Sequence, residues 1–320
     1  MMRPYAFFST AVIAAGVALS APQARAEYPE KPIRIVVALA AGGPTDAVAR
    51  LIGDQMSQAL GQPIIVDNKP GASGQIGYEF AVRSDADGYT LMLTTNTVTT
   101  LPYINTAVQK DLAEKFAPIS IIGIGDLVIA VNSEVPVKTF PEFIEYAKKN
   151  PGKLNFGAQG GTDLITNQFL NYKAGIETEL VRYGGAAPAI QALLANQVQY
   201  GISSIGPFKQ YIDEGKLRPL ALTGFKPYAG LPGVPVASAT LPDFVSTIWT
   251  GLAAPVGTPA AAITKLNGAM QKALASPDVQ AKIRQLGYEP NPSSPAEFAK
   301  LIKDEAAQWK GLADKGLLKP

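Results

Sequence analysis

The 320-residue chain contains no cysteine and no histidine. Without cysteine it forms no disulfide, has no thiolate nucleophile and offers no cysteine for lipid attachment. Without histidine it lacks the commonest general base and zinc ligand, which excludes Ser-His-Asp catalysis and histidine-based zinc sites. The serines fit neither G-x-S-x-G nor S-x-x-K, two patterns of serine hydrolases. The sequence therefore predicts a protein with no catalytic centre, metal or cofactor.

The chain also lacks net charge once its first segment is set aside. Residues 1–26 combine Arg3, an apolar run and an Ala-Arg-Ala ending, the pattern of a secretory signal peptide cleaved after Ala26. Removing Arg3 and Arg25 reduces the 28 basic residues to 26, equal to the 26 acidic ones. A neutral surface does not favour nucleic acid or an anionic membrane as partner. No further apolar run of membrane-spanning length follows, so we expect a protein that diffuses freely outside the cytoplasm.

What the sequence does contain is a repeated alternation of strand and helix patterns. In residues 33–60 the apolar run IRIVVAL leads into the turn AAGGPTD and then an amphipathic helix. Glycine allows close backbone approach and a helix N-terminus favours an anion, so we predict a carboxylate site here. Alternatively, Gly-Gly-Pro only turns the chain and Thr45 only caps the helix. The predicted contacts are Ala41, Gly43, Pro44, Thr45 and Asp46.

Two further strands are predicted at residues 63–67 and 89–95. Between them Gly71, Gly74 and Gly77 lie three residues apart, which resembles a dinucleotide fingerprint only loosely. A close contact of a helix with the sheet is the simpler explanation. The third strand ends in TTNTVTT, and ligands of open α/β sheets bind beyond the carboxyl ends of strands.

A long apolar stretch at residues 118–131 is interrupted by Gly123, Gly125 and Asp126. An unbroken strand is not expected to carry those three residues, so we interpret the stretch as a crossing between two lobes. A return crossing is predicted at residues 244–255.

The 294 residues left after the leader are too many for one ordinary core, which favours two lobes. The prediction assigns residues 27–124 and 251–320 to the first lobe and residues 125–250 to the second. Each lobe is expected to hold a mainly parallel sheet, because strands and helices alternate in both. The last three predicted helices, at residues 259–275, 277–286 and 295–312, are expected to pack back onto the first lobe.

The turn GAQGGTD at residues 157–163 repeats the arrangement of the first turn. Glycines are again followed by Thr-Asp at the start of a predicted helix. If both turns face one cleft, two helix N-termini converge on one anion. The predicted contacts are Gln159, Gly160, Gly161, Thr162 and Asp163.

Several segments, taken in order, resemble the Bug family, the extracytoplasmic solute receptors of tripartite tricarboxylate transporters. They include YPEKPIRIVVALAAGGPTDAVARL, LGQPIIVDNKPGASGQIG, DGYTLML, VRYGGAAPAIQALLANQV and LAAPVGTP. The resemblance implies an α/β, two-lobed periplasmic-binding-protein fold (type II) with two interlobe crossings. It implies a carboxylate ligand held by backbone amides, hydroxyls and waters, and a membrane permease as partner. It also implies that the third contact region consists of Thr95, Asn96 and Thr97. We expect the chain to act as a monomer.

Two departures from the family pattern concern the far end of the ligand. Arg182 and Gly184 flank Tyr183 where the family often has proline and lysine, and two serines replace a frequent Asp-Asn pair. Arg182 is predicted to hold a second carboxylate or, alternatively, to point to solvent. The sequence thus predicts a di- or polycarboxylate, aliphatic or aromatic. The predicted far-end contacts are Arg182, Tyr183, Ser203 and Ser204.

The leading functional hypothesis is a non-catalytic receptor that delivers an organic acid to a permease. A co-receptor that reports the acid to a signalling system is an alternative. A periplasmic hydrolase using Ser203, Ser204 or a threonine is the main rival, although a hydroxyl without a base is a poor nucleophile. A structural or adhesive module would not need two converging glycine turns.

Overall fold

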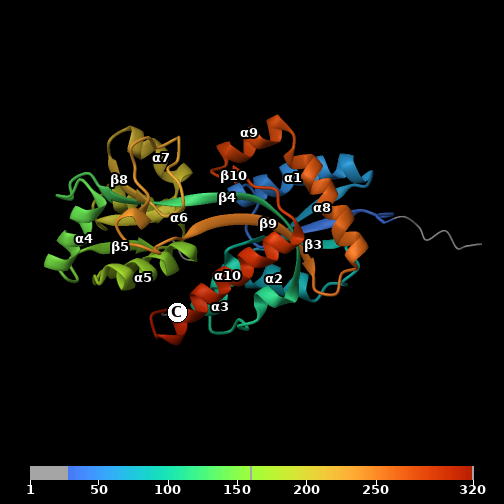
Figure 1. The fold of residues 1–320 in the computed structure, drawn as a ribbon, viewed down its shortest axis with the longest axis horizontal. Helices are drawn as coiled ribbons and strands as arrows, with labels where there is room; N and C mark the ends of the chain where they lie inside the picture. Colours follow the sequence, from blue (N-terminus) through green and yellow to red (C-terminus); the bar gives the residue numbers. More distant parts are fainter. Residues whose placement is uncertain (1–27, 159–160, 319–320) are drawn as a thin grey trace, which may run out of the picture.

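The computed structural model describes residues 28–158 and 161–318, whose strands form two groups connected by β4 and β9 (Figure 1). The strands are β1 (Ile33–Val37), β2 (Ile64–Asn68), β3 (Thr90–Thr95), β4 (Phe116–Asn132), β5 (Asn155–Ala158), β6 (Glu179–Arg182), β7 (Tyr200–Ser204), β8 (Leu217–Leu222), β9 (Thr247–Pro255) and β10 (Glu289–Pro290). The α-helices are α1 (Pro44–Leu60), α2 (Gln75–Val82), α3 (Thr97–Ile104), α4 (Phe140–Lys149), α5 (Thr162–Ala174), α6 (Ala186–Leu194), α7 (Ile205–Asp213), α8 (Ala260–Leu274), α9 (Pro277–Gln285) and α10 (Pro295–Asp314).

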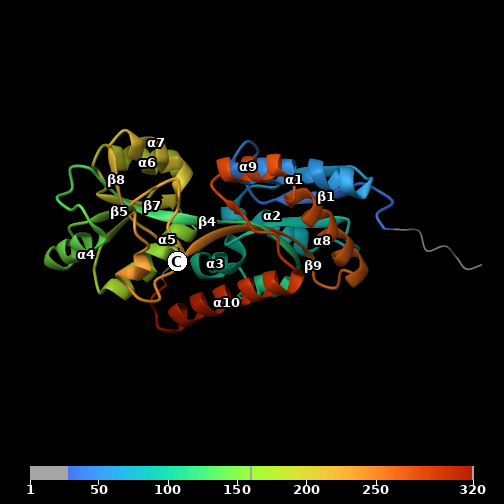
Figure 2. The ribbon, with the colours of Figure 1, turned by 45° about the horizontal axis from the view of Figure 1, so that its top comes forward.

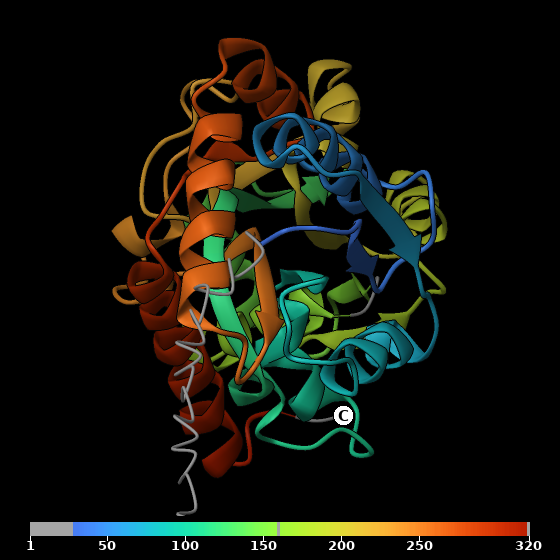
Figure 3. The same cartoon turned by 90° about the vertical axis from the view of Figure 1, so that its right-hand side faces the viewer.

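The first lobe is built on parallel strands β2, β1 and β3, with β9 antiparallel beside β3. Strand β1 is buried on both faces, as its β-branched run predicts: Ile35 packs with α1 and α8, and Val36 with α2, α3 and α10. Figure 2 shows α1 and α9 on one side of this lobe and α10 on the other. The end-on view in Figure 3 shows helices around the whole sheet. Covered on both faces, the sheet leaves the strand ends and their turns free for a site.

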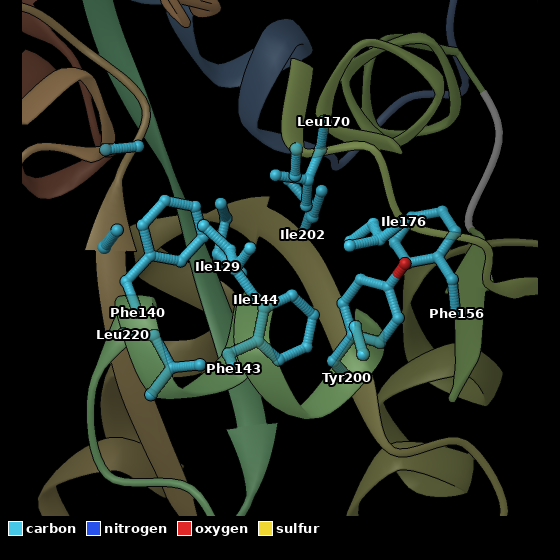
Figure 4. Close-up of a cluster of buried hydrophobic side chains, with 14 of the residues drawn as sticks. Ile129, Phe140, Phe143, Ile144, Phe156, Leu170, Ile176, Tyr200, Ile202 and Leu220 are labelled. Atoms are coloured by element: carbon cyan, nitrogen blue, oxygen red, sulfur yellow. The ribbon is translucent and has the colours of Figure 1, made fainter. Parts of the chain in front are cut away.

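The second lobe holds parallel strands β6, β5 and β7, with the end of β4 antiparallel to both β7 and β8. Its core gathers aromatic side chains around Tyr200 (Figure 4). The Tyr200 ring lies 5.1 Å from Phe143 and 5.3 Å from Phe156, and its hydroxyl donates to Asn167 Oδ1 at 2.6 Å. Because Asn167 is on α5, this satisfied buried phenol fixes α5 against the sheet.

Strand β4 corrects one sequence prediction. Residues 116–132 form one continuous strand, so the expectation that Gly123, Gly125 and Asp126 break it is wrong. Its first part pairs with β9 and its last part with β7 and β8, and two register shifts interrupt the pairing with β9. The glycines are required by packing, because a Cβ at Gly123 would lie 2.8 Å from Tyr288 Cβ. At Gly125 it would lie 2.6 Å from the Gly287 carbonyl oxygen.

Helix α10 departs from the predicted packing of the last helices. Phe298 and Ile302 in its first half belong to a core cluster of the first lobe, but Trp309 and Leu312 belong to that of the second. The Trp309 ring meets Phe169 edge-on at 6.2 Å. A helix pattern shows which face is apolar, and only the tertiary structure shows that this face serves two lobes. The residue boundaries predicted for the lobes stay a prediction.

Candidate ligand-binding site

An open cleft of about 770 Å³ lies between the two lobes. The first lobe lines it with the turn after β1, the start of α3 and residues around the end of α9. The second lobe lines it with the starts of α5, α6 and α7 and the end of β7. The predicted contacts among its lining residues are Pro44, Thr45, Thr97, Gly161, Thr162, Asp163, Ser203 and Ser204.

The first turn presents the N-terminus of α1 to the cleft. Pro44 is the first residue of the helix, where its missing N–H costs nothing. The N–H groups of Thr45 and Asp46 have no carbonyl partner within the helix, so they are available to an anion. Ala41 and Gly43 belong to the same turn but are not among the lining residues.

The Asp46 side chain shapes this turn from within. It is 4% exposed, and its carboxylate accepts from Gly42 N at 2.9 Å and from Arg50 Nε at 3.0 Å. The hydrogen bond from Arg50 lowers the pKa of the Asp46 carboxyl, so the group stays ionised at neutral pH. Arg50 also donates to Asn68 Oδ1, and Asn68 Nδ2 donates to the Leu39 carbonyl. The side chains of Asp46 and Asn68 therefore hold the turn at Gly42 and at Leu39.

The opposing turn presents the N-terminus of α5. Gly161 precedes the helix with φ 79° and ψ −129°, a conformation that L-residues rarely adopt. Thr162 and Asp163 follow in the first helical turn, where the N–H group of Thr162 has no carbonyl partner within the helix. Gln159 and Gly160 lie outside the described residues, so their predicted contacts stay predictions.

The third turn follows β3. Thr97 lines the cleft, and Thr95 lines a small hollow beside it and donates to Thr97 Oγ1 at 3.0 Å. Asn96 is 2% exposed and is not among the lining residues. Its Nδ2 donates to the Thr247 carbonyl at 2.9 Å, and its Oδ1 accepts from Trp249 N at 2.7 Å. Asn96 therefore anchors the turn to β9.

Ser203 and Ser204 reach the cleft from the end of β7. Ser203 is 5% exposed, and within the described residues its hydroxyl makes no hydrogen bond. Ser204 is the N-cap of α7 but makes no side-chain capping bond. Neither hydroxyl has a hydrogen-bond partner in the part of the chain that the structure describes, so both can bind a ligand. Arg182 is exposed and Tyr183 packs against an apolar cluster of the second lobe, and neither is among the lining residues.

Sequence reasoning missed the walls of the cleft. Ser73 lines it with a left-handed backbone, φ 56°, and the glycines on either side were a usable signal for an unusual turn there. Of the three glycines spaced by three residues, Gly77 brings α2 into close contact with Ala38. A close contact of a helix with the sheet was the simpler explanation of that spacing. An apolar residue gives the same pattern whether it faces a core or a cleft. The missed apolar residues are Leu39, Ile104, Leu127, Ile202, Ile248, Leu286 and Tyr288.

The side chains that line the cleft carry little charge. Asp163 is the one charged side chain among the described lining residues. Across residues 28–158 and 161–318, no three acidic, cysteine or histidine side chains cluster as metal ligands would. Within the same ranges, no helix combines the length and apolar character needed to cross a bilayer. Helix N-termini and hydroxyls between apolar walls suit an organic anion.

Two α/β lobes that are joined by two crossing strands and have a cleft between them define the periplasmic-binding-protein fold. Residues 48–317 match the model of the tripartite tricarboxylate transporter family receptor, TctC, and the chain belongs to this family. BugT of Bordetella pertussis is 30% identical over 321 residues, covering 98% of this chain and 97% of BugT. The resemblance to Bug receptors and the predicted fold class are confirmed, and the family consists of periplasmic solute receptors.

Two similar solved structures contain dicarboxylates. Rpa4515 from R. palustris, solved with adipate, is 30% identical with a TM-score of 0.78, covering 90% of this chain and 98% of that one. MatC from Rhodopseudomonas palustris, solved with bound malate, is 29% identical with a TM-score of 0.75, covering 89% and 99%.

Proposed function

We propose that the chain is a non-enzymatic receptor that captures an organic carboxylate between its two lobes. The observation that carries this proposal is that the first turns of α1 and α5, one from each lobe, line the same cleft. Each turn offers backbone N–H groups of a first helical turn and the positive end of a helix dipole. Closure brings both helix ends onto one carboxylate, so binding favours the closed form.

The ligand class we propose is a di- or polycarboxylate, aliphatic or aromatic. Ser203, Ser204 and the first N–H groups of α7 hold the far carboxylate, while the apolar walls contact the carbon frame. The relatives solved with adipate and malate support this class. No described lining residue is cationic. Hydroxyl groups and backbone amides therefore bind the far carboxylate in place of the arginine that the sequence predicted.

The receptor passes its ligand to the membrane permease of a tripartite tricarboxylate transporter, a role that the family description supports. It acts as a monomer in the periplasm after cleavage behind Ala26. Hydrolysis is disfavoured because, within the described residues, the Ser203 hydroxyl makes no hydrogen bond to a side chain that could act as a general base.

A thermal-shift screen of carboxylic acids, run beside an esterase assay, tests the proposal and identifies a saturating acid. With that acid we expect small-angle scattering to give a smaller radius of gyration, because the lobes close around residues 123–126 and 246–251. Identical curves with and without saturating acid would contradict closure. Ester cleavage that disappears in Ser203→Ala would favour the hydrolase instead.

Arg182→Ala is expected to change the affinity for a dicarboxylate by less than about twofold, because an exposed rim charge contributes little. Calorimetry on the diacid and on the monoacid of the same carbon frame measures this. A loss of tenfold or more for the diacid alone would show that Arg182 reaches the ligand when the lobes close.

A further inference from the structure

A polar network joins the last helix to the third cleft turn and to the second crossing. At its centre is Glu305, a partly buried residue in the middle of α10. Its carboxylate accepts from Asn96 Nδ2 at 2.5 Å, Thr99 Oγ1 at 2.7 Å and Trp249 Nε1 at 2.9 Å. These donors come from the start of α3 and from β9. One side chain therefore connects three elements that are far apart in the sequence.

Asn96 extends this network to the cleft. It lies between Thr95 and Thr97 in the third turn, and Thr97 lines the cleft. The Asn96 side chain also holds the backbone of Thr247 and Trp249, where β9 returns from the second lobe. A change at Glu305 thus reaches both a cleft turn and a crossing segment through one residue.

Helix α10 itself contacts both lobes. Its first half packs in the core of the first lobe, while Trp309 and Leu312 pack in that of the second. Gln308 Nε2 donates to the Val245 carbonyl at 3.2 Å, which adds a contact to the crossing. Glu305 lies between the two halves. A rotation of one lobe against the other must therefore be accommodated at this network.

We propose that Glu305 is a positioning residue for the ligand cleft, and that its ionised carboxylate fixes Asn96 and so couples the third cleft turn to the second crossing. The regulatory consequence, a ligand affinity that depends on pH, rests on the proposed function, but the fluorescence titration and the hydrogen-exchange test need no ligand. The physical reason is that an ionised carboxylate only accepts hydrogen bonds, and Glu305 meets three donors. Protonation converts one acceptor into a donor and weakens the hold on Asn96.

The surroundings of Glu305 bring its titration into the neutral range. Burial raises the pKa of the carboxyl to about 7, and the hydrogen bonds from its neighbours oppose this rise. Those neighbours are all uncharged, and β9 contains no titratable side chain. On α3, burial raises the pKa of Tyr103. On α10, the exposed Asp304 pairs with Lys300, and the exposed Lys310 pairs with Asp314. Among the described residues, none of these charged groups forms an ion pair with Glu305.

Ionisation of Glu305 has opposite effects on folding and on binding. The folded-state pKa of about 7 lies above the usual 4.5, so the free energy of unfolding falls as pH rises between these values. Ligand affinity rises as the pH passes through about 7, because the ionised form holds Asn96 and the third turn in place. A side chain with a purely structural role would not give these opposite trends.

The chain contains two tryptophans, and both lie beside this carboxyl. Trp249 donates to it, and Trp309 follows one turn later on α10, where it is among the side chains that hold the pKa of the Glu305 carboxyl down. We expect the tryptophan fluorescence of the ligand-free protein to titrate with a midpoint near pH 7, a step that Glu305→Gln removes. Asp304→Asn, which removes a neighbouring exposed carboxylate, keeps the step. A flat wild-type curve, or a step that survives Glu305→Gln, overturns the proposal.

Hydrogen exchange at one fixed pH tests the coupling. Glu305→Gln is expected to speed exchange in residues 95–104 and 245–251 relative to both wild type and Asp304→Asn, because its amide opposes the Asn96 amide. Unchanged exchange in either segment overturns the coupling.

Calorimetry with adipate adds the ligand. Wild type is expected to bind about tenfold more weakly at pH 6 than at pH 8, and Glu305→Gln to show no such difference. Equal wild-type affinities at both pH values contradict the regulatory consequence. No adipate binding at either pH counts against the proposed ligand class alone, since the titration and exchange results stand without it.

Discussion

Replacing Gly161 with phenylalanine is expected to weaken carboxylate binding roughly 100-fold or more, because a charge-assisted hydrogen bond contributes about 1.5–3 kcal/mol and this turn supplies more than one. A Cβ at Gly161 meets nothing within 4 Å, so the new side chain has room, but the space that it takes is the cleft. The positive φ adds strain of about 1–3 kcal/mol, which lowers stability without unfolding the protein. Titration calorimetry on the identified acid measures the loss.

Gly175 provides the matched control at the other end of the same helix. It also has a positive φ, 62°, and a Cβ there meets nothing within 4 Å, but it does not line the cleft. Gly175→Phe is therefore expected to lower stability and to leave affinity unchanged. Wild-type affinity in Gly161→Phe would remove the opposing turn from the site. Equal losses of affinity in both variants would assign the effect to the stability of α5.

Replacing Ser204 with aspartate is expected to weaken dicarboxylate binding by up to about 1,000-fold, since two like charges 4 Å apart repel by about 4 kcal/mol at an effective dielectric constant near 20. Ser204 is the N-cap of α7, a position that aspartate and asparagine both suit, so the fold is preserved. Ser204→Asn has the same shape as the aspartate without its charge and is expected to cost only a few-fold.

The comparison of Ser204→Asp with Ser204→Asn is made by calorimetry on the diacid and on the monoacid of the same carbon frame. A loss confined to the diacid and to the aspartate variant would place the second carboxylate at the start of α7. Equal effects of aspartate and asparagine would show that the far carboxylate lies elsewhere.

The turns of the site could be predicted because local rules define them. A helix start with close backbone access is predicted by Pro44 after two glycines in the first turn. It is predicted by Gly161 before Thr162 in the opposing turn. Polar side chains within the turns were harder to assign. The Arg50 partner of Asp46 lies four residues away and was visible in the sequence. The Glu305 partner of Asn96 is 209 residues away, and no local pattern shows it.

Long-range packing explains the remaining differences. Gly123 and Gly125 suggested a break in a strand, whereas they make room for the chain around Tyr288. The apolar stripe of α10 was recognisable, but not that Trp309 completes the core of the second lobe. Strand alternation left the direction of Arg182 open, and the structure places it on the surface. Each of these depends on contacts between segments that are distant in the sequence.

Native mass spectrometry tests the central claim, that helix N-termini from both lobes hold a carboxylate. The protein is purified without refolding and incubated with an equimolar pool of aliphatic and aromatic carboxylic acids and their matched amides. The account predicts a one-to-one adduct with an acid, no adduct with its amide, and loss of the adduct in Gly161→Phe. Equal occupancy by an acid and its uncharged amide, or no adduct with any acid in the pool, would contradict it.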